Sequence, residues 1–280
     1  MPEITRTSYG KMSIPVMKVV RKEPAHEVWE FVVDVTAESP ELERSYTRAD
    51  NSPIVATDTM KNLVNYLSFS HDFATLEDLA LHIARSLRER YAHLPRWTVH
   101  IEGAAWNRLT MGGADHPISF ACTGHEVAFT TAVVDGDAHN LSSGLRDLLV
   151  LKTMDSAFSG FHRDEFTTLP ETRDRMLATS ITAEWKIPAS GMDHGRINTA
   201  VRETILHTFA ELKSASVQHL AHETATAVLK SVQEVEEISL RLPNKHYFLI
   251  DLSPFDVKNE DTLYLPTTIP HGDIHLTVRR

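Results

Sequence analysis

The order of strand-like and helix-like segments occurs twice along this 280-residue chain, and it limits the possible folds more than any other feature of the sequence. Apolar residues at every second position indicate a half-buried strand, and spacings of three and four indicate an amphipathic helix. In the first half these patterns predict strands at 9–21 and 26–36, helices at 57–67 and 76–91, and strands at 97–106 and 118–134. In the second half they predict strands at 148–154 and 177–185, helices at 197–212 and 217–232, and strands at 235–251 and 274–279.

Each half therefore reads strand, strand, helix, helix, strand, strand. This order predicts an α+β fold with two antiparallel sheets, each backed by a pair of helices on one face. The halves show no residue-level identity, so the predicted duplication rests on the order of the elements alone. A chain of 280 residues, 42% of them hydrophobic, is long enough to bury two cores. We place the two domains at residues 1–137 and 138–280.

Charge and cysteine content exclude several classes of protein. The net charge of −10 argues against a nucleic-acid surface, because neutralising phosphates takes clustered Lys and Arg. No apolar run is long enough to span a bilayer and residues 1–6 show no signal-peptide pattern, so we expect no membrane partner and a cytoplasmic location. The single cysteine, Cys122, allows neither an internal disulfide nor a multi-cysteine metal site.

The motifs of the common cofactor sites are missing from the sequence. His219, His222 and Glu223 share a helical spacing, but Thr226 stands where a His-Glu-x-x-His motif needs its second histidine, and the sequence places no third ligand. The sequence also lacks a glycine-rich phosphate loop, a Gly-x-Ser-x-Gly elbow and a dinucleotide fingerprint. We therefore expect neither a metal nor an organic cofactor.

From Asn244 onward, one face of the predicted 235–251 strand begins with polar residues. Its period of two places Asn244, His246, Phe248 and Ile250 on one face, so that a row of apolar side chains begins with an amide and an imidazole. Leaving such groups buried without partners costs about 1–3 kcal/mol each. Either the fold or a ligand must supply the partners.

Four other polar clusters have ordinary structural explanations when each is taken alone. Lys11 lies at a strand start, and Thr57 or Asp58 is expected to cap the helix that follows. Residues 158–175 form a loop rich in aromatic and arginine side chains, and residues 214–218 open a helix whose free amides hold either an anion or water.

Taken together, these clusters resemble the urate oxidase (uricase) family. The resemblance is carried by Tyr9-Gly10-Lys11, Val55-Ala56-Thr57-Asp58, Ser214-Ala215-Ser216-Val217-Gln218 and Leu242-Pro243-Asn244-Lys245-His246-Tyr247-Phe248, and by the runs at 45–52, 151–152, 163–165, 167–169, 171–172 and 174–175 together with Phe158. These motifs keep one order and extend over nearly the whole chain. The resemblance implies two tandem tunnelling-fold (T-fold) domains per chain, and a homotetramer around a central tunnel with active sites at the subunit interfaces.

The resemblance also implies roles for individual residues. Lys11, Thr57 and His246 would form a catalytic proton relay in which the lysine acts through its neutral amine. Asn244 would hold dioxygen, and later water, above the substrate ring. Substrate binding would use Thr57 and Asn244 together with the Arg175 fork, the Gln218 amide, the Phe158 ring, the main-chain amides of Asp58 and Val217, and the Leu169 side chain.

The implied reaction converts urate, dioxygen and water to 5-hydroxyisourate and hydrogen peroxide without a metal or organic cofactor. Fully deprotonated urate is electron-rich enough to reduce dioxygen, so the protein has to deprotonate and orient it. The connection at 186–195 is shorter than in fungal members, and the chain ends Val278-Arg279-Arg280 without a peroxisomal Ser-Lys-Leu signal, which again favours the cytoplasm. The alternatives are another T-fold enzyme acting on pterins or purines, although the zinc-dependent cyclohydrolases need more than one cysteine, and a non-catalytic purine-binding protein.

Overall fold

The computed structural model describes residues 3–189 and 191–280, so residue 190 of the 186–195 connection lies outside the described residues. The chain divides into two compact units. The first comprises Met1–Gly144 and Lys186–Asn198, and the second comprises Leu145–Trp185 and Thr199–Arg280. Each compact unit is made of two separate stretches of chain, so the units do not correspond to a single boundary along the sequence. The predicted domain boundary between residues 137 and 138 stays a prediction.

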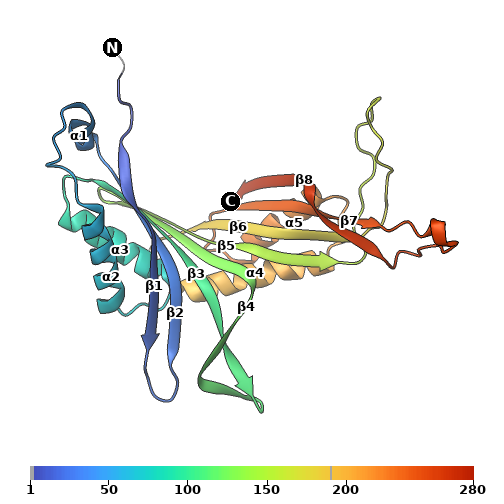
Figure 1. Cartoon of the computed structure of the whole chain (residues 1–280), viewed down its shortest axis with the longest axis horizontal. Coiled ribbons are helices and arrows are strands. Elements are labelled where there is room, and N and C mark those ends of the chain that lie inside the picture. The colour runs from blue at the N-terminus through green and yellow to red at the C-terminus, as the bar shows by residue number, and fades with distance from the viewer. Residues whose placement is uncertain (1–2, 190) are drawn as a thin grey trace. The chain divides into compact units, whose positions relative to one another are not determined.

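The first unit has the predicted order of strands and helices. Its strands β1 (Ser8–Val20), β2 (Glu27–Glu38), β3 (Arg96–Met111) and β4 (Ala114–Asp135) hydrogen-bond in this order and are antiparallel. Helices α2 (Thr57–Ser70) and α3 (Leu76–Arg90) lie on one face of these strands, with α2 against β1 and α3 against β3 and β4 (Figure 1). The predicted polar connection at 37–52 also holds two short helices, η1 (Pro40–Leu42) and α1 (Glu43–Thr47).

The core of the first unit follows directly from the sequence pattern. Alternate residues of β2 are buried, with Phe31 at 2% and Val33 at 0% exposure, and the apolar stripe of α3, which includes Ile83, is buried as well. The Thr75 side chain caps α3, because its oxygen accepts a hydrogen bond from the Asp78 amide at 3.3 Å. This half of the chain thus needs little beyond its local pattern to form the sheet and its helical cover.

The second unit contains β7 (Glu237–Leu249) and β8 (Tyr264–Arg279), with the short helix η2 (Ser253–Phe255) between them, and all of β6 (Leu177–Ile187) except its last two residues. Strand β5 (Ala138–Lys152) and helix α4 (His194–Glu211) each run from the first unit into this one, and α5 (Val217–Ser231) packs on β7 and β8. The connection 153–176 between β5 and β6 forms a long loop, drawn in yellow-green in Figure 1. This loop carries several of the predicted site residues.

Strand β8 is ten residues longer at its start than the alternation predicted. Pro266, Pro270 and Gly272 interrupt the pattern there, and such residues normally argue against a strand. Residues 264–267 nevertheless pair with β7. An edge strand tolerates proline because one side of it needs no ladder donor.

The sequence pair Thr123-Gly124 is typical of a turn and predicts a break within the 118–134 strand. This prediction is wrong, because β4 is continuous through these residues. The chain reverses instead at Gly112 and Gly113, whose φ angles of 61° and 84° lie in the left-handed region that glycine adopts freely. The pairing of β3 with β4 shifts register between Ala104 and Trp106, opposite residues 123–126. Gly124 therefore lies at an irregularity in the β3–β4 ladder and not in a hairpin turn.

A bulge in β1 determines which of its side chains face the helices. Lys11 pairs with Val35 and Ile14 with Val33, so three residues of β1 oppose two of β2 at this point. Ser13 within the bulge has φ 57°, and its amide donates a hydrogen bond to the Asp34 carboxylate at 2.6 Å. The extra residue shifts the alternation by one position. Lys11 is thereby brought to the same face as the buried Ile14, a result that strict alternation along the strand does not give.

Ser13 gives a first prediction. Replacing it by Gly should leave the free energy of unfolding unchanged or raise it by up to about 1 kcal/mol, because glycine adopts a positive φ without strain. Replacing it by Val should lower stability by about 1–2 kcal/mol, since a β-branched residue is strained there. Urea unfolding of both variants tests this, with Met12→Val as a control beside the bulge. Equal stabilities for the Gly and Val variants would contradict the strain argument.

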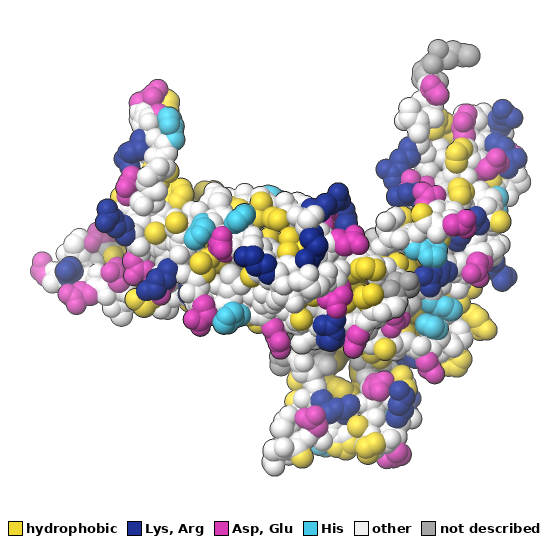
Figure 2. All heavy atoms as spheres, turned by 180° about the vertical axis from the view of Figure 1, so that it is seen from behind, with side chains coloured by type: hydrophobic (Ala, Val, Ile, Leu, Met, Phe, Trp, Pro, Cys, Tyr) yellow, Lys and Arg dark blue, Asp and Glu magenta, His cyan; other side chains and the backbone are white. Residues whose placement is uncertain are grey.

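The face drawn in Figure 2 carries charges of both signs, with Lys and Arg side chains interspersed with Asp and Glu. Among the described residues, none of the helices combines the length and the apolar character needed to cross a membrane.

Candidate active site

A pocket of about 800 Å³ in the second unit brings together seven of the ten predicted site residues. These are Phe158, Leu169, Arg175, Val217, Gln218, Asn244 and His246. They come from the 153–176 loop, from the start of α5 and from β7. Segments separated by more than 80 positions in the sequence thus meet at one concave surface.

Arg175 is the half-buried cation of this pocket. Its guanidinium carbon lies 5.8 Å from the centre of the Phe158 ring, and its Nε finds no hydrogen-bond partner among the described residues. Burial lowers the pKa of Arg175 from its ordinary value, because a buried cation gives up part of its hydration. A desolvated donor without a partner is costly, so this side chain is suited to bind an anionic or carbonyl-bearing ligand.

The surroundings of His246 in the same pocket favour its neutral imidazole. Burial lowers its pKa, and the positive charge of Arg175 and the neighbouring His271 act in the same direction. Its ring stacks on Phe248 with 5.9 Å between centroids and 18° between planes. A neutral imidazole can accept a proton, so His246 is suited to proton transfer at neutral pH.

The Phe158 ring is positioned by main-chain pairing within the loop. Phe158 and Thr172 exchange two backbone hydrogen bonds of 2.8 and 2.9 Å, and the Phe158 ring stacks on Phe161 at 4.8 Å with 12° between planes. The Thr172 hydroxyl donates to the carbonyl of Asp174 at 2.7 Å. These contacts connect the segment that presents Phe158 to the segment that presents Arg175.

The start of α5 contributes backbone amides to the pocket. Ser216 is its N-cap and accepts a hydrogen bond from the His219 amide at 3.0 Å. Val217 and Gln218 form the first turn, where amides have no partner within the helix. Two bonds join this region to the loop, from Ala157 to the Ser214 carbonyl at 2.8 Å and from Ser214 to the Asp155 carbonyl at 3.1 Å. Val217 and Gln218, at the start of this helix, therefore line the same pocket as Phe158.

The other three predicted residues form a second cluster, in the first unit. Thr57 and Asp58 open α2, and Lys11 lies near Asp58 on β1. A hydrogen bond from Lys61 holds the pKa of Asp58 below its usual range, with the Asn62 amide and the Lys11 charge acting in the same direction. The carboxylate of Asp58 is thus engaged by its own helix, whereas its main-chain amide is in the first turn, where no helical partner exists.

The predicted capping of α2 by Thr57 or Asp58 is wrong. The N-cap is Ala56, which makes no side-chain hydrogen bond to the first turn. Thr57 is already the first helical residue. The threonine hydroxyl is consequently not used as a cap and remains suited to the predicted relay.

Several pocket residues could not be singled out from the sequence. Thr153, Met176, Tyr264 and Ile274 also line the pocket. Tyr264 pairs with Leu249 of β7, and only the register of β7 with β8 brings it there. If the strand predicted at 274–279 had been extended back to residue 264, its pairing with β7 would have indicated Tyr264 as a pocket residue.

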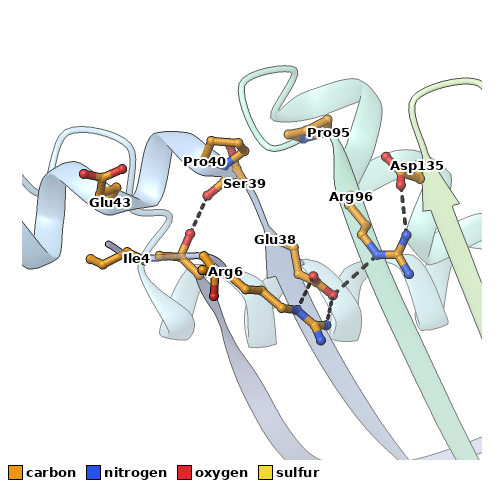
Figure 3. Close-up of a pocket in the computed structure, with 11 residues that line it drawn as sticks. Ile4, Arg6, Glu38, Ser39, Pro40, Glu43, Pro95, Arg96 and Asp135 are labelled. Carbon is orange, nitrogen blue, oxygen red and sulfur yellow. Dashed lines mark hydrogen bonds and ion pairs between the residues drawn. The ribbon is translucent and has the colours of Figure 1, made fainter. Parts of the chain in front are cut away.

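A second pocket, of about 290 Å³, lies in the first unit and contains none of the predicted site residues among those that line it (Figure 3). Arg6 donates two hydrogen bonds to the Glu38 carboxylate, at 2.7 and 2.8 Å. Arg96 forms ion pairs with Asp135 at 2.9 Å and with Glu38 at 3.4 Å. The charges here neutralise one another, so this pocket does not offer the free cation that an anionic substrate needs.

The described residues contain no group of three or more His, Cys, Asp or Glu placed to hold a metal ion. His222 is paired with Glu223 on the exposed side of α5, with Nδ1 3.1 Å from the carboxylate. The expectation of a cofactor-free protein stays a prediction.

Comparison with known proteins assigns the family. A sequence model described as Uricase matches residues 7–133 and 141–275. The uricase of Aspergillus flavus is 37% identical over 297 residues, covering 100% of this chain and 98% of that protein, and the uricase of Danio rerio is 34% identical over 291 residues, covering 99% and 95%. The crystal structure of uricase from Arthrobacter globiformis matches with a TM-score of 0.94 at 32% identity, covering 100% of this chain and 96% of that chain.

The two relatives cover 99% and 100% of the chain, and the family model matches it in two consecutive segments, one in each half. They confirm the predicted fold class, an α+β fold of two tandem T-fold domains with antiparallel sheets backed by helices. The chain belongs to the uricase family.

Proposed function

We propose that this protein is a urate oxidase that uses dioxygen and water to convert urate to 5-hydroxyisourate and hydrogen peroxide. The observation that carries the proposal is the 800 Å³ pocket, which combines an unpartnered Arg175 Nε, an aromatic ring and a neutral imidazole. A planar anionic heterocycle satisfies all three at once, because it offers a face for stacking and an edge of hydrogen-bonding atoms.

Substrate binding follows from the chemistry of the lining side chains. The Arg175 fork fits a carbonyl oxygen and a ring nitrogen side by side, and the Gln218 amide can donate and accept along another edge. The Phe158 ring supports one face of the substrate, with Leu169 closing the wall. The amides of Val217 and Asp58, each in the first turn of a helix, add donors where the helix dipole favours negative charge.

Proton transfer is assigned to Lys11, Thr57 and His246. Removing protons from urate makes it a reductant for dioxygen, so the chemical task of the protein is to accept those protons and deliver them to the reduced oxygen. The neutral state of His246 is consistent with this task. Asn244, two residues earlier on β7, is the group assigned to hold dioxygen and then water above the ring.

We also propose a homotetramer in which each active site uses two chains. The ten site residues separate into a cluster on the first unit and a cluster on the second, and neither cluster is complete by itself. Within the described strands, β1 pairs with β2 and β8 with β7, so each of these strands has a free edge. Both strands also carry exposed apolar side chains, such as Met17 on β1 and Ile269 on β8. An unpaired strand edge beside apolar side chains favours pairing with another copy of the chain. A cytoplasmic location is part of the same proposal.

Oxygen uptake with urate tests the proposed function. We expect purified protein to consume dioxygen and urate, to release peroxide, and to keep its rate after exhaustive chelation. Catalase should return half of the consumed oxygen, because two peroxides disproportionate to one dioxygen and water. Activity that is lost on chelation and restored by added metal would contradict the cofactor-free reaction. Binding of urate without oxygen uptake would identify a purine-binding protein instead.

A further inference from the structure

Tyr9 makes an unusual pair of hydrogen bonds with the main chain just before α2. Its hydroxyl accepts a hydrogen bond from the Val55 amide at 2.7 Å and donates one to the Val55 carbonyl at 3.1 Å. Val55 belongs to no helix or strand, and its side chain is only 8% exposed. One phenol therefore satisfies both main-chain groups of a residue that lacks a ladder partner.

This contact lies at the entrance to α2, where the usual means of fixing a helix start is missing. Ala56 is the N-cap and provides no side-chain hydrogen bond. The neighbouring Pro53 carbonyl is held by His93, whose Nε2 lies 3.0 Å away. The first turn, which begins with Thr57, thus takes its position from contacts made two and four residues earlier.

Tyr9 also shares a strand face with Lys11. The two residues are separated by one position, so their side chains lie on the same side of β1, about 7 Å apart along the strand. Between them, Gly10 is pressed against β2, where an added Cβ would lie 1.9 Å from the Val35 carbonyl oxygen. After Lys11 comes the bulge that is fixed by Asp34. The backbone that carries both side chains is therefore held closely on β2.

The Tyr9 phenol is also suited to remain a donor. Burial raises its pKa above the ordinary value for tyrosine. The proton needed for the bond to the Val55 carbonyl is consequently retained over the pH range in which the enzyme would operate.

We propose that Tyr9 is a positioning residue that fixes the Thr57 hydroxyl relative to the Lys11 amine for proton transfer. The proposal rests on the proposed function, because it gives Lys11 and Thr57 their roles in the relay. Tyr9 itself touches neither urate nor dioxygen in this scheme. It acts by joining β1, which carries Lys11, to the segment that leads into α2.

The test is the Tyr9→Phe variant, which keeps the ring and removes both hydrogen bonds. We expect kcat to fall about 10- to 100-fold, since small displacements of reacting groups cost rates of this order, while KM changes by less than about threefold. The kcat–pH profile should shift, because the surroundings of the relay groups change. Tyr66→Phe is the matched control, since Tyr66 lies on α2 itself but is 64% exposed. It should leave kcat, KM and the pH profile unchanged.

A double-mutant cycle separates positioning from general destabilisation. If Tyr9 acts through Thr57, adding Tyr9→Phe to Thr57→Ala should lower kcat by less than about threefold further. Independent, multiplying losses would overturn the proposal, as would a Tyr9→Phe variant that equals wild type in kcat and pH profile. If Tyr9→Phe does not fold, Tyr9→His, whose shorter ring cannot donate and accept through a single atom as the phenol does, enters the same cycle with the same criteria. Wild-type protein that fails to oxidise urate would overturn both proposals, whereas an active wild type with an unaffected Tyr9→Phe variant would overturn only this one.

Discussion

Replacing Lys11 by Met should lower kcat for urate oxidation by about 10²- to 10⁴-fold, the range over which a positioned acid–base group contributes to a rate. Methionine keeps an unbranched stem of similar length and removes the amine. Affinity for a non-reacting substrate analogue should change by less than about threefold, because binding is assigned mainly to the pocket lined by Arg175 and Phe158. Steady-state kinetics and analogue titration give the two numbers.

The control for this experiment is Lys22→Met. Lys22 follows β1, and its side chain is 59% exposed in an ion pair with Glu27, an arrangement that contributes little to stability. This variant should retain wild-type turnover and affinity. Preserved turnover in the Lys11→Met variant near neutral pH would remove Lys11 from the relay.

Mixing two inactive variants should restore activity if each site is shared between chains. Lys11→Ala removes a group of the first-unit cluster, and Arg175→Ala removes a group of the second-unit cluster. In a closed symmetric oligomer with random mixing, about a quarter of the sites would combine an intact Lys11 from one chain with an intact Arg175 from another. Each variant refolded alone should remain inactive, and the co-refolded sample should recover roughly a quarter of the wild-type rate.

Native mass spectrometry is the control for subunit mixing. It has to show tetramers that each contain chains of both variants. Mixed tetramers that stay as inactive as their parents would show that the complete site lies within one chain. The same experiment with Arg175→Ala and Phe158→Ala provides a negative control, because both residues belong to one cluster. Every site in this mixture would lack either Arg175 or Phe158, so no recovery is expected.

Local sequence pattern determined most of the architecture. The stripe of α3 behind its Thr75 cap and the alternation of β2 around Val33 can be recognised within a single window of sequence, because amphipathic periodicity and capping are local properties. The alternation of the 235–251 strand drew attention to Asn244 and His246, whereas Arg175 and the other site residues were implied by the resemblance of the polar motifs to the uricase family. Their assembly into one pocket is beyond local pattern, yet seven of the ten meet there.

Only the tertiary structure decided which way certain side chains point. The bulge at Ser13 brings Lys11 to the helix-facing side of β1, and it depends on a hydrogen bond from Asp34 on another strand. The pairing of Tyr9 with Val55 and the extension of β8 through Pro266 depend in the same way on partners that are distant in sequence. Hydrogen-bond pairing between separate segments is a property of the folded chain, so periodicity within one segment could not reveal it.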